Sequence, residues 1–423
     1  MCTLENARSL SAAFYPPLLC GSIKSIMDKV NIDKKRIDEI INRGVEDIFI
    51  KEELTALLLS GKQLRIKLGV DPTGPKMHIG RAIPLRKLRE FQKLGHQIVF
   101  IVGDFTAQVG DASDKNEKRP MLTRAQIDEN IKDYKSQVSK IIDVTKAEFL
   151  YNSDWLSKLT FDDVAKLSEC FSVQQMLARR NFKDRYDAGV EISLREFLYP
   201  LMQGYDSVAV KADVELGGFD QLFNLKAGRV VQEFYGMPKQ QIMVGSMLEG
   251  TDGRKMSTSW GNVINIIDDP YDMFGKIMSL RDDLIIKYFI LCTDVSLEDI
   301  QTIEIEMKNG ANPKDIKIRL GVELVTLYHT EKDATLAKNS WIETFEKGGV
   351  PDAVPEIITT ADKELANVLV EAGIVTSKTD WRRLVDEGAV HDVETGVITN
   401  VKVLAYAGTF KIGKKRFVKI TVE

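Results

Sequence analysis

The most regular hydrophobic pattern of the chain lies between residues 64 and 91. Apolar residues alternate with polar or small ones over 64–70, which is the period of a half-buried strand. Two prolines and a glycine over 71–75 cannot continue that strand and favour a turn. Apolar residues then recur at helical spacing over 79–91. The pattern predicts a strand, a tight loop and a helix whose free N–H groups and positive dipole end face the loop.

A second apolar run, over 97–102, is uninterrupted and lies between Gly95 and Gly103, as is typical of a strand buried on both faces of a parallel sheet. With the strand and helix before it, this run predicts a right-handed βαβ unit. Gly and Pro over 348–360 predict a linker. The same patterns predict helices within 33–60, 123–143, 154–180, 270–345, 361–371 and 378–387, and strands over 148–151, 208–214 and 418–422.

Composition narrows the class of protein without identifying it. The 423 residues carry a net charge of −4, with 44% hydrophobic and 28% charged residues, as expected of a soluble globular chain of several domains. The charge argues against wholesale coating of a nucleic acid such as DNA, and no apolar run is long enough for a membrane span. The cysteines form no CxxC pair and the histidines are dispersed, so we expect a cytoplasmic protein without disulfides or a protein-built metal site.

Two stretches far apart in the chain carry residue types suited to a nucleotide. His78 and Gly80 lie where the loop after the first strand meets the helix, a position where a phosphate can bind and a nucleotide can approach the backbone. The alternative for this stretch alone is an ordinary helix cap with an isolated histidine. Much later, residues 249–262 read EGTDGRKMSTSWGN, a cationic loop that includes Lys255. Such a loop can close on a polyphosphate and neutralise the charge that develops as phosphate transfers.

A polar cluster is predicted at Tyr199, Gln203 and Asp206, which are spaced by four and three residues, so a helix places them on one face. Burying these groups without partners would be unfavourable. They therefore form either an internal hydrogen-bonding cluster or a site for a small ligand that carries an ammonium group and a hydroxyl. Shortly afterwards, Gly218 allows close backbone approach, and Asp220 can accept hydrogen bonds from ribose hydroxyls.

Two further groups of charged residues have both a ligand-binding and a solvent-exposed interpretation. Asp111, Lys115 and Arg119 follow the strand over 97–102, at the edge where ligands bind in open α/β sheets, but they equally fit a solvated loop. The segment 361–423 reads as a separate small domain, and its basic residues form either an RNA-facing surface or a solvated basic strand. The candidate RNA-binding residues are Arg382, Arg383, Lys414, Lys415 and Arg416.

Together, the two nucleotide-type stretches resemble the HIGH and KMSKS signatures of class I aminoacyl-tRNA synthetases, here present as His78-Ile79-Gly80-Arg81 and Lys255-Met256-Ser257-Thr258-Ser259. With the polar cluster and the basic C-terminal segment, residues 35–423 closely resemble the bacterial tyrosyl-tRNA synthetases. The stretch KLGVDPT at 67–73 is most similar to the second bacterial type. The resemblance implies ATP-dependent activation of L-tyrosine to tyrosyl-adenylate and its transfer to the 3′ end of tRNA(Tyr).

The same resemblance implies an α/β fold with a Rossmann-like parallel-sheet catalytic domain. The expected partners are L-tyrosine, ATP with accompanying Mg²⁺, tRNA(Tyr) and a second copy of the chain. The parts would be, in order, an N-terminal extension over 1–35, the catalytic domain over 36–250 with a dimerisation region inserted over 120–200, the signature loop with a helical anticodon-binding domain over 251–347, the linker over 348–360, and a small α+β RNA-binding domain of the alpha-L type over 361–423.

Residue by residue, the resemblance implies roles for the polar side chains. Tyr199, Gln203 and Asp111 would hold the ammonium group of tyrosine. Asp206 would accept a hydrogen bond from its phenol, and Gln221 would lie near its carboxylate. The implied ATP-binding residues are Asp71, Gly80, Gly218, Asp220, Lys255 and Thr258. The implied catalytic residues, which face the departing pyrophosphate, are Thr73, His78, Arg81, Lys115, Arg119 and Lys255.

Several positions depart from the family pattern. Arg81 replaces the second signature histidine and Thr258 replaces the second signature lysine, so one phosphate-facing cation is lost and another is gained on the opposite side. We expect Arg81 to restore part of the lost electrostatic stabilisation. Ala112 and Asp114 stand where a GDPSGK-like loop usually has proline and glycine, and Asp114 adds negative charge near the phosphates.

Two alternatives from different classes stay open. One is a class I synthetase for tryptophan, against which the combination of Asp206 with Tyr199 and Gln203 argues. The other is a catalytically silent RNA-binding paralogue, suggested by Arg81 and Thr258, which would bind tRNA and form no adenylate.

Overall fold

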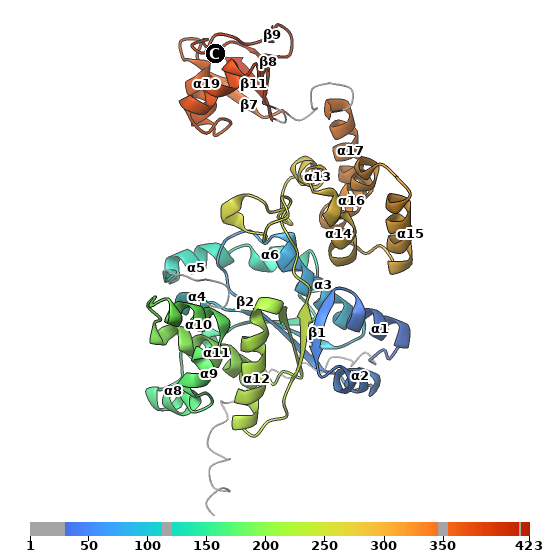
Figure 1. Ribbon diagram of the computed structural model, residues 1–423, viewed down its shortest axis with the longest axis vertical. Helices are drawn as coiled ribbons and strands as arrows, with labels where there is room; N and C mark the ends of the chain where they lie inside the picture. The colour runs from blue at the N-terminus through green and yellow to red at the C-terminus, as the bar shows by residue number, and fades with distance from the viewer. Residues whose placement is uncertain (1–29, 112–120, 346–353, 414–415) are drawn as a thin grey trace, which may run out of the picture.

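The computed structural model describes residues 30–111, 121–345, 354–413 and 416–423. Figure 1 shows an α/β domain, a helical domain and a small C-terminal domain, the last drawn at the end of the molecule farthest from the α/β domain. Among the described residues, no helix combines the length and the apolar character that a membrane crossing requires.

The α/β domain is built on a six-stranded sheet with the order β1-β6-β5-β2-β3-β4. The strands are β1 (Val45–Phe49), β2 (Arg65–Val70), β3 (Gln97–Val102), β4 (Ala147–Tyr151), β5 (Val214–Gly218) and β6 (Gln241–Gly245). All neighbours pair in parallel except β1, which is antiparallel to β6 at one edge. The predicted parallel-sheet α/β fold is thus confirmed. From β2 the chain adds β3 and β4 toward one edge of the sheet, and from β5 it adds β6 toward the other edge. The strand order therefore reverses between β2 and β5, and open parallel sheets bind ligands at such a point.

Helices cover this sheet, and a second set of helices forms the helical domain that follows in the chain. Those of the α/β domain are α1 (Lys34–Asn42), α2 (Lys51–Leu59), α3 (Ile79–Lys93), α4 (Thr106–Val109), α5 (Arg124–Ile131), α6 (Tyr134–Ser139), α7 (Ser153–Leu156), α8 (Phe161–Ser168), α9 (Val173–Leu177), α10 (Arg180–Asp187), α11 (Leu194–Ala209) and α12 (Leu222–Phe234), with the 3₁₀ turn η1 (Phe219–Gln221). After the 3₁₀ turn η2 (Thr258–Trp260) come α13 (Pro270–Met278), η3 (Asp282–Leu284), α14 (Ile285–Cys292), α15 (Leu297–Lys308), α16 (Pro313–Tyr328) and α17 (Glu331–Phe345).

Two local predictions are wrong. The strand predicted over 208–214 is largely helix and turn, because α11 continues to Ala209 and β5 begins only at Val214. A capping box at Ser193 starts α11, and burial of its apolar face overrides the β-preference of the valines at its end. The region 33–60, predicted as helices, contains β1 between α1 and α2, because this short strand finds its partner in the distant β6.

The C-terminal domain has its own sheet and core. Its elements are β7 (Glu356–Thr359), α18 (Leu365–Glu371), α19 (Lys378–Asp386), β8 (Val390–Asp392), β9 (Gly396–Val397), β10 (Gly408–Ile412) and β11 (Arg416–Val422), with the strand order β7-β11-β10-β8-β9. Strand β7 pairs in parallel with β11, so residues 356–359 belong to this domain and not to the linker predicted over 348–360. The fully buried Trp381 lies in the hydrophobic core.

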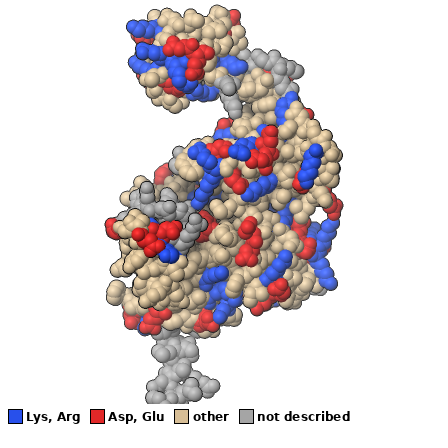
Figure 2. All heavy atoms as spheres, in the orientation of Figure 1, with Lys and Arg blue, Asp and Glu red and all other residues tan. Residues whose placement is uncertain are grey.

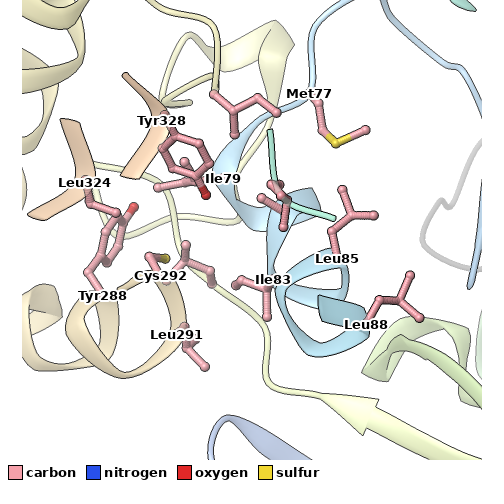
Figure 3. Packing of buried hydrophobic residues seen from close by; sticks show 14 of the residues in the cluster. Met77, Ile79, Ile83, Leu85, Leu88, Tyr288, Leu291, Cys292, Leu324 and Tyr328 are labelled. Carbon is pink, nitrogen blue, oxygen red and sulfur yellow. The ribbon is translucent and has the colours of Figure 1, made fainter. Parts of the chain in front are cut away.

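One hydrophobic core joins the α/β domain to the helical domain. Ile79 and Ile83 of α3 lie beside Tyr288 and Cys292 of α14 and Tyr328 of α16 (Figure 3). All five side chains are buried. The helix that begins directly after His78 therefore packs against the helical domain as well as on the sheet.

Candidate functional site

Polar residues predicted from distant parts of the chain line one cleft of about 370 Å³. The cleft lies at the carboxyl ends of β2 and β5, where the strand order reverses. The predicted residues in its lining are Asp71, Thr73, His78, Gly80, Arg81, Asp111, Tyr199, Gln203, Asp206, Gly218, Asp220, Gln221 and Lys255. Thr258 is not in the lining and instead begins η2. Both signature stretches and the polar face of α11 thus share a single cavity.

Backbone pairing brings the two signature stretches together. The N–H of Ile79 donates to the carbonyl of Ile264 at 2.8 Å, and the N–H of Ile266 donates to the carbonyl of Met77 at 3.0 Å. The start of α3 is therefore paired with the chain that follows the loop 249–262. This pairing accounts for the meeting of two segments that are remote in the sequence.

His78 and Gly80 lie at this contact. A Cβ at position 80 would be 3.1 Å from both Met256 Sδ and His78 Nδ1, so glycine permits the close approach. Burial, helped by the positive charge of Arg81, lowers the pKa of His78 to about 3. Its Nδ1 is buried and has no hydrogen-bond partner among the described residues. The imidazole is therefore neutral, and it offers a ligand a hydrogen bond without a charge.

The Arg81 side chain is held at the cleft by two hydroxyl groups. Its Nη2 donates to Thr73 Oγ1 at 2.5 Å, and its Nη1 donates to the hydroxyl of Tyr134 at 3.4 Å. Tyr134 is fully buried and donates in turn to the carbonyl of Gly74 at 3.2 Å, in the loop between β2 and α3. Because a guanidinium stays charged at all working pH values, this arrangement presents a fixed cation to an anionic ligand.

Lys255 provides a second cation in the cleft lining. Its Nζ lies 3.8 Å from Asp220 Oδ2. The loop that carries it is cross-linked, because Asn262 Nδ2 donates to Asp252 Oδ1 at 2.8 Å and to the carbonyl of Lys255 at 3.1 Å. Arg254 Nη2 also donates to Asp252, at 2.6 Å. These bonds position Lys255 beside the 3₁₀ turn that follows β5.

The other half of the cleft combines hydroxyl, amide and carboxylate groups. The Tyr199 hydroxyl donates to Asp71 Oδ2 at 3.0 Å, and Thr106 Oγ1 donates to Asp71 Oδ1 at 2.7 Å. Burial and the charge of Asp71 raise the pKa of Tyr199 well above its usual value, so the phenol stays protonated. Gln221 Nε2 donates to Asp111 Oδ2 at 2.7 Å. These acceptors form an acidic end of the cavity.

Asp206 faces the cleft from α11 and is only 3% exposed. Trp155 Nε1 donates to its Oδ1 at 2.8 Å, and Asn152 Nδ2 donates to its Oδ2 at 3.3 Å. Burial raises the pKa of Asp206 to about 7, although the charge of Lys67 and these two hydrogen bonds oppose that shift. Neither Asn152 nor Trp155 is among the predicted residues. Asn152 directly follows β4, and this place at the carboxyl end of a parallel strand is the signal that identifies it.

Six of the singled-out residues lie outside the described part of the chain: Ala112, Asp114, Lys115, Arg119, Lys414 and Lys415. In the C-terminal domain, Arg382 and Arg383 of α19 and Arg416 of β11 are exposed. Arg383 donates to Asp380 at 2.7 Å. Figure 2 shows basic and acidic side chains next to one another on the face of this domain that is in view.

Comparisons with known proteins place this chain beside one group of enzymes. Residues 59–346 match the family described as tRNA synthetases class I (W and Y). The chain is 44% identical over 388 residues to a tyrosine–tRNA ligase of Thermotoga maritima, covering 90% of this chain and 96% of that protein. It is 45% identical over 405 residues to one of Carboxydothermus hydrogenoformans, covering 92% and 98%. It is 44% identical over 386 residues to tyrosine–tRNA ligase 2 of Vibrio cholerae, covering 90% and 98%.

Solved structures share the fold. A C-terminally truncated mitochondrial tyrosyl-tRNA synthetase of Aspergillus nidulans matches with a TM-score of 0.61 at 21% identity, covering 73% of this chain and 94% of that one. The tyrosyl-tRNA synthetase of Archaeoglobus fulgidus, solved with L-tyrosine, matches with a TM-score of 0.57 at 23% identity, covering 72% and 98%. At these identities the likeness concerns the fold alone.

Proposed function

This chain belongs to the tyrosine–tRNA ligases of the class I aminoacyl-tRNA synthetases, and we propose that its cleft activates L-tyrosine with ATP to tyrosyl-adenylate and then transfers the tyrosyl group to the 3′ end of tRNA(Tyr). The observation that carries this assignment of the cleft is that both signature stretches and the polar face of α11 line it. A site with neutral donors, fixed cations and a buried acceptor suits an amino acid beside a triphosphate.

The acidic end of the cleft would bind tyrosine. The carboxylate of Asp111, with the side chains of Tyr199 and Gln203, supplies acceptors for the ammonium group. Asp71, for which the resemblance implies a role at ATP, accepts a hydrogen bond from the Tyr199 hydroxyl, so we propose that it supports this end of the cleft instead. Asp206 lies 3% exposed and is held by two donors, so its remaining lone pairs suit a phenolic hydroxyl. A buried acceptor that phenylalanine would leave unpaired gives selectivity without editing, a device for which tyrosyl-tRNA synthetases are themselves the standard example.

The opposite end of the cleft would bind ATP as its magnesium complex, in which the metal is part of the substrate. Gly80 permits adenosine to approach the start of α3, and Gly218 and Asp220 would lie beside the ribose. Arg81 and Lys255 then bring positive charge to the triphosphate.

The first step would be an in-line attack by the tyrosine carboxylate oxygen on the α-phosphorus. A new carboxyl–phosphorus bond forms while the bond to pyrophosphate breaks, and pyrophosphate leaves with its electron pair. No covalent intermediate on the enzyme is needed. Neutral His78 and Thr73 would donate hydrogen bonds, and Arg81 and Lys255 would stabilise the charge that develops on the leaving group.

The second step would bring the terminal adenosine of tRNA(Tyr) to the adenylate, where a ribose hydroxyl attacks the acyl carbon and releases AMP. We propose that exposed Arg382, Arg383 and Arg416 of the C-terminal domain, with neighbouring Lys414 and Lys415, help to hold the RNA. Since its RNA substrate and ATP meet where protein synthesis occurs, we propose a cytoplasmic location.

Pyrophosphate exchange into ATP, measured separately with each of the twenty amino acids, tests the proposal. We expect exchange with tyrosine and none with tryptophan, because Asp206, which lines the cleft, would accept a hydrogen bond from the phenol of tyrosine. Exchange with tryptophan instead would favour the other branch of the matched family. Binding of tRNA without any exchange would identify a catalytically silent RNA-binding paralogue and contradict the proposal.

We also infer that the chain forms a homodimer through the region inserted over 120–200. Large apolar side chains are unusually exposed there: Phe161 is 91% exposed, Leu194 79% and Tyr186 65%. These are the three most exposed large apolar side chains among the described residues, and large apolar groups left in water mark candidate protein–protein interfaces.

Replacing Leu194 with aspartate is expected to weaken this dimer, because a charge buried in an interface without a partner is unfavourable. Light scattering after size exclusion should give twice 47.6 kDa for the wild type and a mass near 47.6 kDa for Leu194→Asp. The control is Ile305→Asp, which adds the same charge at a 52% exposed position of α15 and should leave the mass unchanged. A monomeric wild type would rule out the dimer.

A further inference from the structure

A lysine and a glutamate form an ion pair in the interior of the α/β domain. Lys67 of β2 and Glu215 of β5 lie on adjacent strands, and their side chains are 0% and 1% exposed. The distance from Lys67 Nζ to Glu215 Oε1 is 2.9 Å. The alternating pattern over 64–70 predicts a half-buried strand, but Lys67 on its polar face is fully covered. Such burial is rare for lysine and requires an explanation.

The pair is tied to the helix that carries the proposed tyrosine site. Lys67 Nζ donates to the carbonyl of Gln203 at 2.9 Å and to Ser207 Oγ at 2.8 Å, both on α11. Glu215 accepts from Gln203 Nε2 at 3.2 Å and from Ser207 Oγ at 3.2 Å. Gln240 Nε2 completes the set by donating to Glu215. These hydrogen bonds therefore fix both the distance of α11 from the sheet and the rotation of the helix about its own axis.

Asp206 lies between the two residues of α11 that the Lys67 ammonium contacts. The charged and titratable groups that face it are Lys67 from β2, Glu215 from β5 and Tyr199 from the preceding turns of α11. Its other partners, Asn152 and Trp155, are uncharged donors. Of these groups, only Lys67 brings a positive charge to a carboxylate that is removed from water.

We propose that the buried Lys67–Glu215 pair is a positioning device for substrate specificity: it orients α11 so that Gln203 and Asp206 face the cleft, and the Lys67 charge keeps Asp206 an acceptor for the hydroxyl of the substrate. This inference rests on the proposed function and goes beyond it, because Lys67 and Glu215 do not line the cleft. A buried ion pair by itself contributes little to stability, since desolvation offsets the attraction. A role in positioning the site explains its presence better than a role in stability does.

Lys67 and Glu215 carry opposite charges near Asp206, so replacing one or the other should move the pH midpoint of Asp206 in opposite directions. In Lys67→Met, loss of the positive charge should move the midpoint of the pH profile of kcat/KM for tyrosine upward by about one to three units, the usual range for removing a close opposite charge. In Glu215→Gln, loss of a negative charge should move the midpoint downward. A purely structural role would lower activity at every pH without moving the midpoints apart.

The experiment is tyrosine- and phenylalanine-dependent pyrophosphate exchange on the full chain between about pH 5 and 10, a range that includes the midpoints expected for both variants. Phenylalanine has no hydroxyl, so kcat/KM for phenylalanine should not fall when Asp206 is protonated, and its profile serves as an internal reference. The matched control is Arg65→Met, which removes a cation from the same face of β2. Arg65 bonds Glu148 and the carbonyl of Val210 at the end of α11. That variant should keep the wild-type midpoint.

Midpoints that move in opposite directions support the proposal. Unmoved midpoints, or two shifts in the same direction, overturn it. If Lys67→Met does not fold, Glu215→Gln carries the test alone, and a midpoint that fails to fall refutes the charge relation. A wild type without tyrosine-dependent exchange would instead overturn the proposed function and would be recognised before any variant is compared.

Discussion

Replacing Asp206 with asparagine is expected to lower kcat/KM for tyrosine by about one to two powers of ten, while kcat/KM for phenylalanine changes little. A hydrogen bond from the substrate hydroxyl to a charged acceptor is lost, at about 1.5–3 kcal/mol. The new amide also points an N–H toward Trp155 Nε1 or Asn152 Nδ2, which are themselves donors. This buried donor stays unpaired in the free and in the bound enzyme, so it lowers stability by about 1–3 kcal/mol and not the preference for tyrosine.

The same substitution should remove a pH dependence. Burial raises the pKa of Asp206 to about 7, so the carboxylate gains a proton as the pH falls through that value. The acceptor is then lost, and kcat/KM for tyrosine, which reports the free enzyme, should fall below about pH 7. Asparagine cannot titrate, so Asp206→Asn should lack this midpoint. Pyrophosphate exchange against pH with both amino acids measures the effect.

A matched control is available next to the site. Asp104 is also a buried carboxylate, 1% exposed, but it binds Ser153 and Arg124 and does not line the cleft. Asp104→Asn should lower stability and leave the preference for tyrosine over phenylalanine unchanged. A wild-type preference in Asp206→Asn would contradict the role of Asp206 as the acceptor for the phenol.

Replacing Arg81 with histidine is expected to slow adenylate formation by about one to three powers of ten, as for the loss of one preorganised donor to a developing charge. Thr73 and Tyr134 hold the guanidinium in the cleft before ATP arrives, so it needs little reorganisation in the transition state. A buried imidazole at this position would be neutral, as His78 is. Single-turnover measurement of adenylate formation separates this effect from tyrosine binding, which should change little.

The compensation between Arg81 and Thr258 can be tested directly. Arg81→His combined with Thr258→Lys restores both family residues and should recover part of the lost rate. Arg89→His is the control on the same helix, because Arg89 bonds Asp294 away from the cleft and should affect stability alone. An unchanged rate in Arg81→His would reject compensation.

The sequence is informative where short-range patterns specify the chemistry. The βαβ unit from β2 to β3 follows from a period of two, a proline- and glycine-containing loop and a period of about 3.6. The spacing of Tyr199, Gln203 and Asp206 places them on one helix face, and all three line the cleft. The signature stretches identify which distant segments belong together, although nothing local specifies the backbone pairing that joins them.

Long-range burial explains what the sequence does not reveal. Lys67 alternates with apolar neighbours as a solvent-facing residue would, and only the packing of α11 over β2 buries it. In the sequence, Trp155 looks like an ordinary apolar residue of a helix. The structure shows that its indole N–H donates to the carboxylate of Asp206 on α11. The valines at the end of α11 favour a strand, whereas the capping box at the start of the helix and the core on one side of it favour the helix.

The core shared by α3, α14 and α16 has a thermodynamic consequence. A ligand that displaces α14 or α16 must either carry Ile79 and Ile83 with it or open a void around Tyr288 and Tyr328, and close-packed interiors resist such voids. An RNA that displaced either helix would therefore change the geometry at the start of α3. By thermodynamic reciprocity, if RNA changes the affinity for the nucleotide by some factor, the nucleotide changes the affinity for RNA by the same factor.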